Sequence, residues 1–200
     1  MPLERTNSLT EDTQIVDGLP PPSAGLTVRH IAVGRGTQNY TCDASKPDDA
    51  PKATGAVATL FNVTCMATVY PDVAARMTGM AVHFSLVDAD RLGPNVLPVS
   101  GHHFFTQKGV PYFDLGEIGQ APTAKNNSAP APATAASGQK GEPAVPWLKL
   151  TTVDGATGNI REVYRVETAG GSAPKTCRGQ PDHIEVQYAA QYWFWEGKPE

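Results

Sequence analysis

The most regular pattern in the sequence lies near the end of the chain. From His183 to Trp195, large apolar side chains such as Ile184, Tyr188 and Phe194 occupy every second position. Successive side chains of a β-strand point to opposite faces of the sheet, so this alternation predicts an antiparallel strand with one face buried. The second face carries His183, Glu185, Gln187, Ala189, Gln191, Trp193 and Trp195.

Shorter segments repeat this alternation along the chain. We expect strands within 26–42, 55–66, 80–86, 101–107, 110–115, 147–152 and 160–168. Only 70–77, with Pro71 at its start, suggests a turn or two of helix. The chain also contains 19 Gly and 18 Pro, which punctuate the strands with turns. These features predict an all-β, single-domain antiparallel β-sandwich or barrel with long loops and at most one or two short helices.

Local composition divides the chain further. Residues 1–24 are polar, end in Leu19 and three prolines, and are expected to form an extended N-terminal arm. A single β-domain should occupy 25–197, with a tail at 198–200. Within it, 119–145 is dominated by Ala, Pro and Gly and is expected to be a mobile surface loop.

Charge excludes some partners. The net charge of −4 offers no basic field for nucleic acid, so we expect no nucleic-acid partner. No segment approaches the ~20 apolar residues that cross a bilayer, so no membrane span is expected. The sequence leaves the oligomeric state open.

Several residues suggest passage through the secretory pathway. Asn39, Asn62 and Asn126 each begin an N-glycosylation acceptor motif. The strand patterns place Asn39 and Asn62 opposite the larger apolar sets, and hence in solvent. We therefore expect an extracellular protein whose signal peptide is absent from this sequence because it has been removed. A cytosolic protein with unused acceptor motifs is the alternative.

Three cysteines, Cys42, Cys65 and Cys177, allow one disulfide and leave one thiol. All three pairings are open on spacing alone. Cys42 and Cys65 would lie at opposite ends of a hairpin if their strands are consecutive antiparallel neighbours, too far apart to bridge. An unpaired Cys65 is expected to point into the core and be inert.

No cofactor or metal site is predicted. Gly34 and Gly36 superficially match a dinucleotide-binding loop, but Asn39 occupies the third glycine position and no helix follows. We expect these glycines to permit a bulge or a tight turn. Neighbouring residues on a strand face opposite ways, so His102 and His103 cannot share a metal ion.

Two groups of residues are candidates for function. His103 is the best candidate for an acid or base, with a structural histidine as the alternative. Gln187, Gln191, Trp193 and Trp195 share one face of the last strand and could bind a sugar by stacking and by amide hydrogen bonds. Alternatively, they could pack beneath the long loop or the N-terminal arm as a second small core.

Several ordered motifs resemble those of a secreted, largely fungal family with bacterial relatives, catalogued as domain of unknown function 3455. The motifs are Gly34 to Cys42, Gly55 to Phe61, Gly101 to Phe105, Trp147 to Leu150, Tyr164 to Pro174 and Tyr192 to Trp195. The resemblance implies secretion and a Cys42–Cys177 disulfide. It also implies that His103, rather than His102, is the better candidate for an acid or base. It implies no established activity. Some fungal members are labelled malate dehydrogenase, which nothing in this sequence supports.

Three functions remain open from the sequence. The leading hypothesis is a secreted, non-enzymatic binding module for a small molecule, glycan or host-surface component. The second is a cofactor-free enzyme, a hydrolase or isomerase, that uses His103 as acid or base. The third is a structural protein of a cell wall or matrix.

Overall fold

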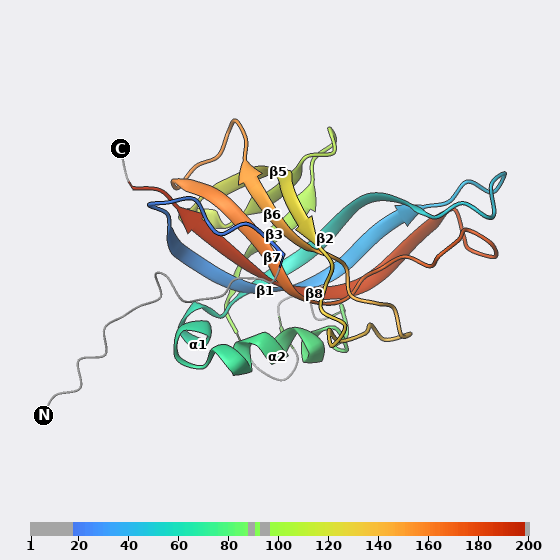
Figure 1. The fold of residues 1–200 in the computed structure, drawn as a ribbon, viewed down its shortest axis with the longest axis horizontal. Coiled ribbons are helices and arrows are strands. Elements are labelled where there is room, and N and C mark those ends of the chain that lie inside the picture. Colours follow the sequence, from blue (N-terminus) through green and yellow to red (C-terminus); the bar gives the residue numbers. More distant parts are fainter. Residues whose placement is uncertain (1–17, 88–90, 93–96, 199–200) are drawn as a thin grey trace, which may run out of the picture.

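A computed structural model describes residues 18–87, 91–92 and 97–198. Eight antiparallel strands of this part of the chain form a closed barrel (Figure 1). Each strand pairs with the next in sequence, and β8 closes the barrel on β1. The strands are β1 Thr27–Thr41, β2 Lys52–Asn62, β3 Val99–Phe105, β4 Pro111–Asp114, β5 Gln120–Ala129, β6 Trp147–Thr152, β7 Ile160–Gly170 and β8 His183–Glu196. The all-β prediction is confirmed. Of the two predicted architectures, sandwich and barrel, the structure is a barrel.

Alternate side chains fill the barrel interior, as expected for eight strands. Tyr188, Tyr192 and Phe194 of β8 are buried in the interior cluster. The rings of Tyr192 and Phe194 contact Phe113, and the hydroxyls of Tyr188 and Tyr192 hydrogen-bond at 2.8 Å. Gly34 and Gly36 lie within β1, at neither a turn nor a bulge, contrary to the sequence expectation. A Cβ on Gly36 would lie 1.8 Å from the Val57 carbonyl oxygen. These glycines therefore allow close approach to the β1 backbone.

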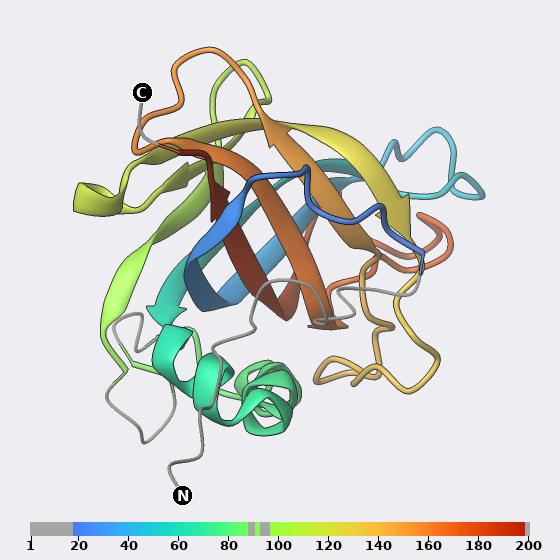
Figure 2. The same ribbon diagram turned by 60° about the vertical axis from the view of Figure 1, so that its left-hand side comes forward.

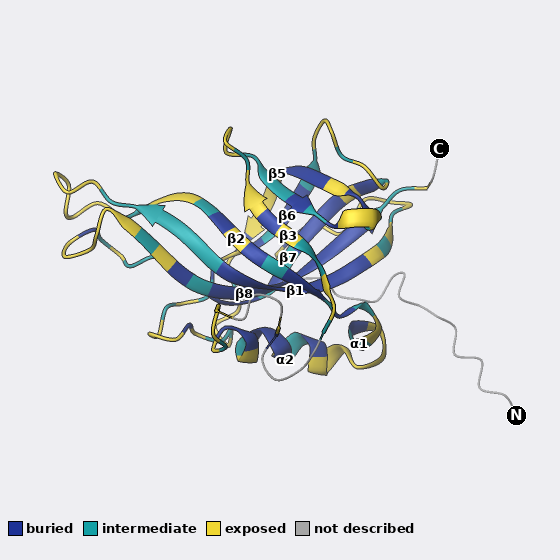
Figure 3. Ribbon diagram, turned by 180° about the vertical axis from the view of Figure 1, so that it is seen from behind, coloured by how far each residue is buried: buried dark blue, intermediate teal, exposed yellow. Residues whose placement is uncertain are grey.

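The outside of the barrel carries a second core. Helices α1 Thr64–Val69 and α2 Pro71–Ala81 lie along the outside of the barrel. Buried and exposed residues are interleaved on α2 (Figure 3). Buried residues of α2 recur at helical spacing, at Ala74, Met77 and Ala81. The helix at 70–77 is thus confirmed but extends to Ala81. The expected strand over 80–86 is wrong, because Met80 and Ala81 belong to the last turn of α2.

The expected strand over 55–66 ends earlier than its alternation suggests. β2 stops at Asn62, whose side-chain oxygen accepts a hydrogen bond from the Thr64 backbone N–H at 2.9 Å. This contact satisfies a backbone donor in the first turn of α1. Cys65 consequently lies on a helix and is exposed, so its expected inward orientation is wrong.

The expected surface loop over 119–145 is also shorter than its composition suggests. Residues 120–129 form β5, which pairs with β4 and β6. All five side chains from Ala124 to Ser128 are exposed, so this part of the strand is held in the barrel by its backbone pairing with β6. Composition reports on side chains and cannot reveal such pairing. A short 3-10 helix, η1 Gly116–Ile118, precedes β5.

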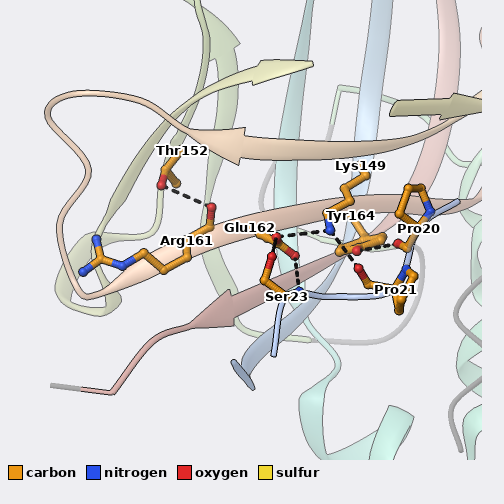
Figure 4. A network of polar contacts seen from close by, with 8 residues as sticks. All are labelled: Pro20, Pro21, Ser23, Lys149, Thr152, Arg161, Glu162 and Tyr164. Atoms are coloured by element: carbon orange, nitrogen blue, oxygen red, sulfur yellow. Dashed lines mark hydrogen bonds and ion pairs between the residues drawn. The ribbon is translucent and has the colours of Figure 1, made fainter. Parts of the chain in front are cut away.

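The end of the N-terminal arm packs on the barrel. Residues 18–26 cross its outside ahead of β1 (Figure 2). The carbonyl oxygen of Pro20 accepts a hydrogen bond from the Tyr164 hydroxyl at 2.8 Å, and that of Pro21 accepts one from Lys149 Nζ at 2.8 Å (Figure 4). Ser23 donates its hydroxyl to Glu162 at 2.6 Å. The first 17 residues of the expected arm lie outside the described residues.

One disulfide joins Cys42 to Cys177, with 5.4 Å between the Cα atoms. It links the end of β1 to the loop before β8, where β1, β2 and β8 extend beyond the rest of the barrel (Figure 1). The pairing implied by the family resemblance is confirmed. Among the described residues, no helix has the length and apolar character needed to cross a membrane.

Candidate binding site

His103 packs inside the barrel. Its ring is stacked on Phe113 with 4.2 Å between centroids, and its Nδ1 donates a hydrogen bond to the Tyr112 carbonyl oxygen at 2.9 Å. Burial lowers the pKa of His103 to about 4, so the ring is neutral near pH 7. Asp114 pairs with His102 and therefore faces the other side of the sheet, where its carboxylate does not orient His103. This environment supports a structural role.

The tryptophans of β8 also lie in a core. Trp193 and Trp195 are buried in the cluster between the barrel and the helices. The Trp193 indole donates to the Gln191 amide oxygen at 3.0 Å, and Gln191 is buried too. This arrangement supports the packing alternative, with α2 among the elements that cover this face. The pattern predicts only one buried face, because it cannot show that helices cover the other.

Gln187 is separated from the tryptophans and lines a polar groove. Two pockets of about 240 and 350 Å³ share Thr37, Leu86 and Glu185, and so form one groove outside β1 and β8. Gln187 itself donates to the Phe84 carbonyl oxygen at 2.7 Å and accepts from Gln139 at 3.2 Å. Its amide therefore hydrogen-bonds to neighbouring loops through both its nitrogen and its oxygen.

A third pocket, which we call the α2 pocket, has a different character. Its volume is about 280 Å³, and it lies between α2, the loop at 132–136, and the adjoining ends of β6 and β7. It is lined by Ala75, Arg76, Thr78, Gly79, Pro132, Thr134, Ala135, Ala136, Trp147, Glu167 and Thr168. None of these residues was a candidate in the sequence analysis.

The two strands bring Trp147 and Glu167 to the same end of their ladder. Leu148 pairs with Arg165, Trp147 precedes Leu148, and Glu167 lies two residues beyond Arg165. The register of β7 against β8 shifts between Val166 and Ala169, which marks a β-bulge. Glu167 has a φ of 47°, in the left-handed region that is unfavourable for a residue with a Cβ. Bulges of this kind re-aim side chains.

Two polar groups on residues that line the α2 pocket lack partners in the described part of the chain. Trp147 is 7% exposed, and its buried Nε1 has no hydrogen-bond acceptor among the described residues. The half-buried Glu167 carboxylate makes no ion pair or side-chain hydrogen bond with any described residue, and burial raises its pKa. By contrast, the Thr168 hydroxyl donates to the Val145 carbonyl oxygen at 2.6 Å. Among the described residues, the pocket lining thus includes an unused donor on Trp147 and an unused acceptor on Glu167.

Unpartnered buried groups are uncommon and need an explanation. Trp195 also has a buried indole N–H without a partner among the described residues, but Trp195 lines none of the three pockets described above. In the α2 pocket, the unpartnered Trp147 donor and the unpartnered Glu167 carboxylate occur together with open volume. Sequence offers no signal for it, because neither a positive φ nor a missing partner can be read from residue type.

The predicted glycosylation sites differ in accessibility. Asn126 on β5 is exposed, whereas Asn39 and Asn62 are half-buried. Asn39 lines the polar groove, where its side-chain oxygen accepts a hydrogen bond from the Thr37 hydroxyl at 2.9 Å. Asn126 therefore has the most open environment of the three.

The chain was compared with known proteins. No curated protein and no solved structure matches it. One family profile, described as Protein of unknown function (DUF3455), matches residues 22–196. This range includes all eight strands completely, from the docked arm through the end of β8 at Glu196. The match agrees with the resemblance seen in the motifs, and the chain belongs to the DUF3455 family.

Proposed function

We propose that this protein is a secreted, non-enzymatic module that binds a small molecule in the α2 pocket. The observation that carries the proposal is Trp147, which lines a pocket of about 280 Å³ and whose buried Nε1 has no hydrogen-bond acceptor among the described residues. Leaving a buried donor unsatisfied costs about 1–3 kcal/mol. A ligand that supplies an acceptor would recover that free energy on binding.

The volume of the pocket favours a small molecule over the other two expected ligands, a glycan and a host-surface component. Small-molecule sites are concave, largely apolar, and carry a few polar groups that orient the ligand. The α2 pocket has this composition, with alanines and Pro132 beside Trp147 and Glu167. A volume of about 280 Å³ suits a small molecule better than an extended glycan or a protein surface.

Secretion is supported by the Cys42–Cys177 disulfide, since such bonds persist in oxidising compartments. The exposed acceptor motif at Asn126 agrees with it. The enzyme alternative has less support, because His103 is buried against Phe113 and lines none of the three pockets described. A purely structural protein would have no use for an unpaired donor and acceptor in one pocket.

A pocket-filling variant tests the proposal. Ala75 lines the α2 pocket from α2, so Ala75→Phe should fill it. Val73 is half-exposed on the same helix and does not line the pocket, which makes Val73→Phe the matched control. A library of small polar metabolites would be screened against the full chain by thermal shift and by NMR chemical-shift perturbation.

At least one compound should bind the native protein and Val73→Phe but lose at least 10-fold in affinity for Ala75→Phe. The proposal fails if no compound binds, or if every bound compound binds Ala75→Phe as well as it binds the control. Thermal unfolding of each variant alone would show that both remain folded.

A further inference from the structure

Building on the proposed binding function, we infer that the ligand of the α2 pocket is a small zwitterion of the α-amino-acid type. Its ammonium group would bind Glu167, and its carboxylate would bind the Trp147 indole N–H and Arg76. The assignment of charges comes from groups that the fold brings to one pocket and leaves unpaired.

The ammonium site follows from Glu167. Its carboxylate is half-buried on the pocket wall and lacks a cationic partner among the described residues. A partly desolvated carboxylate is stabilised by an opposite charge placed against it. A ligand ammonium group, with three N–H donors, supplies both the charge and the hydrogen bonds.

The carboxylate site follows from two donors. Arg76 reaches the pocket from the exposed side of α2, and Trp147 lines it from β6. A guanidinium group binds carboxylates through parallel N–H donors, and an indole can only donate. No ion pair joins Arg76 to Glu167, although both line the same pocket. The two opposite charges are therefore separated, which leaves room for a ligand that bridges them.

The remaining wall suits a short apolar side chain. Ala75, Ala135, Ala136 and Pro132 present methyl and ring carbons to the pocket. An aliphatic group that enters it would remove apolar surface from water, which favours binding. We therefore expect an aliphatic amino acid to bind better than glycine.

The backbone at Glu167 agrees with a binding role. Glycine or asparagine would adopt a φ of 47° at lower cost, so a glutamate held there in a β-bulge requires compensation. Placing a carboxylate toward a ligand supplies a reason for such strain. A merely structural bulge would gain nothing from the carboxylate.

Three matched probes test the charges separately. L-leucine carries both charged groups, N-acetyl-L-leucine lacks the ammonium, and isoamylamine lacks the carboxylate. Each would be titrated into the full chain by calorimetry and NMR. L-leucine should bind, and each of the other two should bind at least 10-fold more weakly.

Two variants test whether the Glu167 carboxylate binds the ammonium group of the ligand. Glu167→Gln should reduce affinity for L-leucine at least 10-fold and leave the weak binding of N-acetyl-L-leucine unchanged. Glu185→Gln, in the polar groove, is the control and should change neither value. Chemical shifts of the variants alone would show that the barrel is intact.

The inference is overturned if N-acetyl-L-leucine or isoamylamine binds as well as L-leucine, or if Glu167→Gln leaves L-leucine binding intact. It is likewise overturned if L-leucine does not bind. In each of these cases the proposed function survives when another compound binds in a manner sensitive to Ala75→Phe, so the two failures are distinguishable.

Discussion

Lys149 and Glu162 form an ion pair on the outside of the barrel, with 3.1 Å between Lys149 Nζ and Glu162 Oε1 and side chains only 7% and 5% exposed. They lie on adjacent strands, β6 and β7. Residues 20–23 of the N-terminal arm cover the pair and complete its hydrogen bonds (Figure 4). The arm is therefore part of the folded domain at this point, because it shields two charges from water and satisfies them.

Breaking this ion pair should destabilise the protein strongly. Glu162→Ala leaves the Lys149 charge buried without a partner, and we expect a loss of about 3–5 kcal/mol in the free energy of unfolding. Urea denaturation measures it. The exposed Arg178–Asp48 pair is the control, since Asp48→Ala should have little effect. A loss for Glu162→Ala no larger than that for Asp48→Ala would contradict the prediction.

The disulfide should contribute substantially to stability. Cys42 and Cys177 are 135 residues apart, and a crosslink that closes so long a loop restricts the unfolded chain considerably. Replacing both by Ser should lower the free energy of unfolding by about 2–5 kcal/mol. Cys65→Ser should be close to neutral, because Cys65 is exposed and unpaired. Equal midpoints for the double variant and the native protein would refute this expectation.

Stability should fall on mild acidification. Burial lowers the pKa of both His30 and His103 to about 4, from 6.5, so the native state binds fewer protons than the unfolded chain between these values. The contribution of each neutral histidine to the free energy of unfolding is therefore fully present above pH 6.5. It is lost as the pH falls toward 4, by up to about 3 kcal/mol for each histidine. His103→Phe should flatten this dependence in urea titrations between pH 6.5 and 4. An unchanged slope would show that His103 is not responsible.

Relieving the strain at Glu167 should stabilise the fold. Glycine adopts a φ of 47° without a steric penalty, so Glu167→Gly should raise the free energy of unfolding by about 1 kcal/mol. Asn159, with a φ of 56°, is the matched control. Asparagine tolerates this region better, and Asn159→Gly should gain less. Thermal unfolding compares the two, and a destabilised Glu167→Gly would indicate that the side chain supports the bulge.

The alternation of β8 predicts the strand correctly but describes only one of its two buried faces. Tyr188, Tyr192 and Phe194 fill the barrel, as the pattern suggests. Trp193 and Trp195 pack beneath elements outside the barrel, which a periodicity of two cannot show. The same limitation places Asn62 in solvent and Cys65 in the core, whereas the structure half-buries Asn62 and exposes Cys65.

The sequence by itself determined the class of fold, the antiparallel strands with strong alternation, and a short helix after Pro71. These depend on neighbouring residues, whose periodicity records which side chains are buried. Tertiary structure alone decided the closure of β8 on β1, the strand at 120–129, the covering of the barrel by α2, and the meeting of Trp147 with Glu167. Each of these depends on backbone pairing or on packing between distant segments. Such contacts leave no periodic trace in the residues that make them.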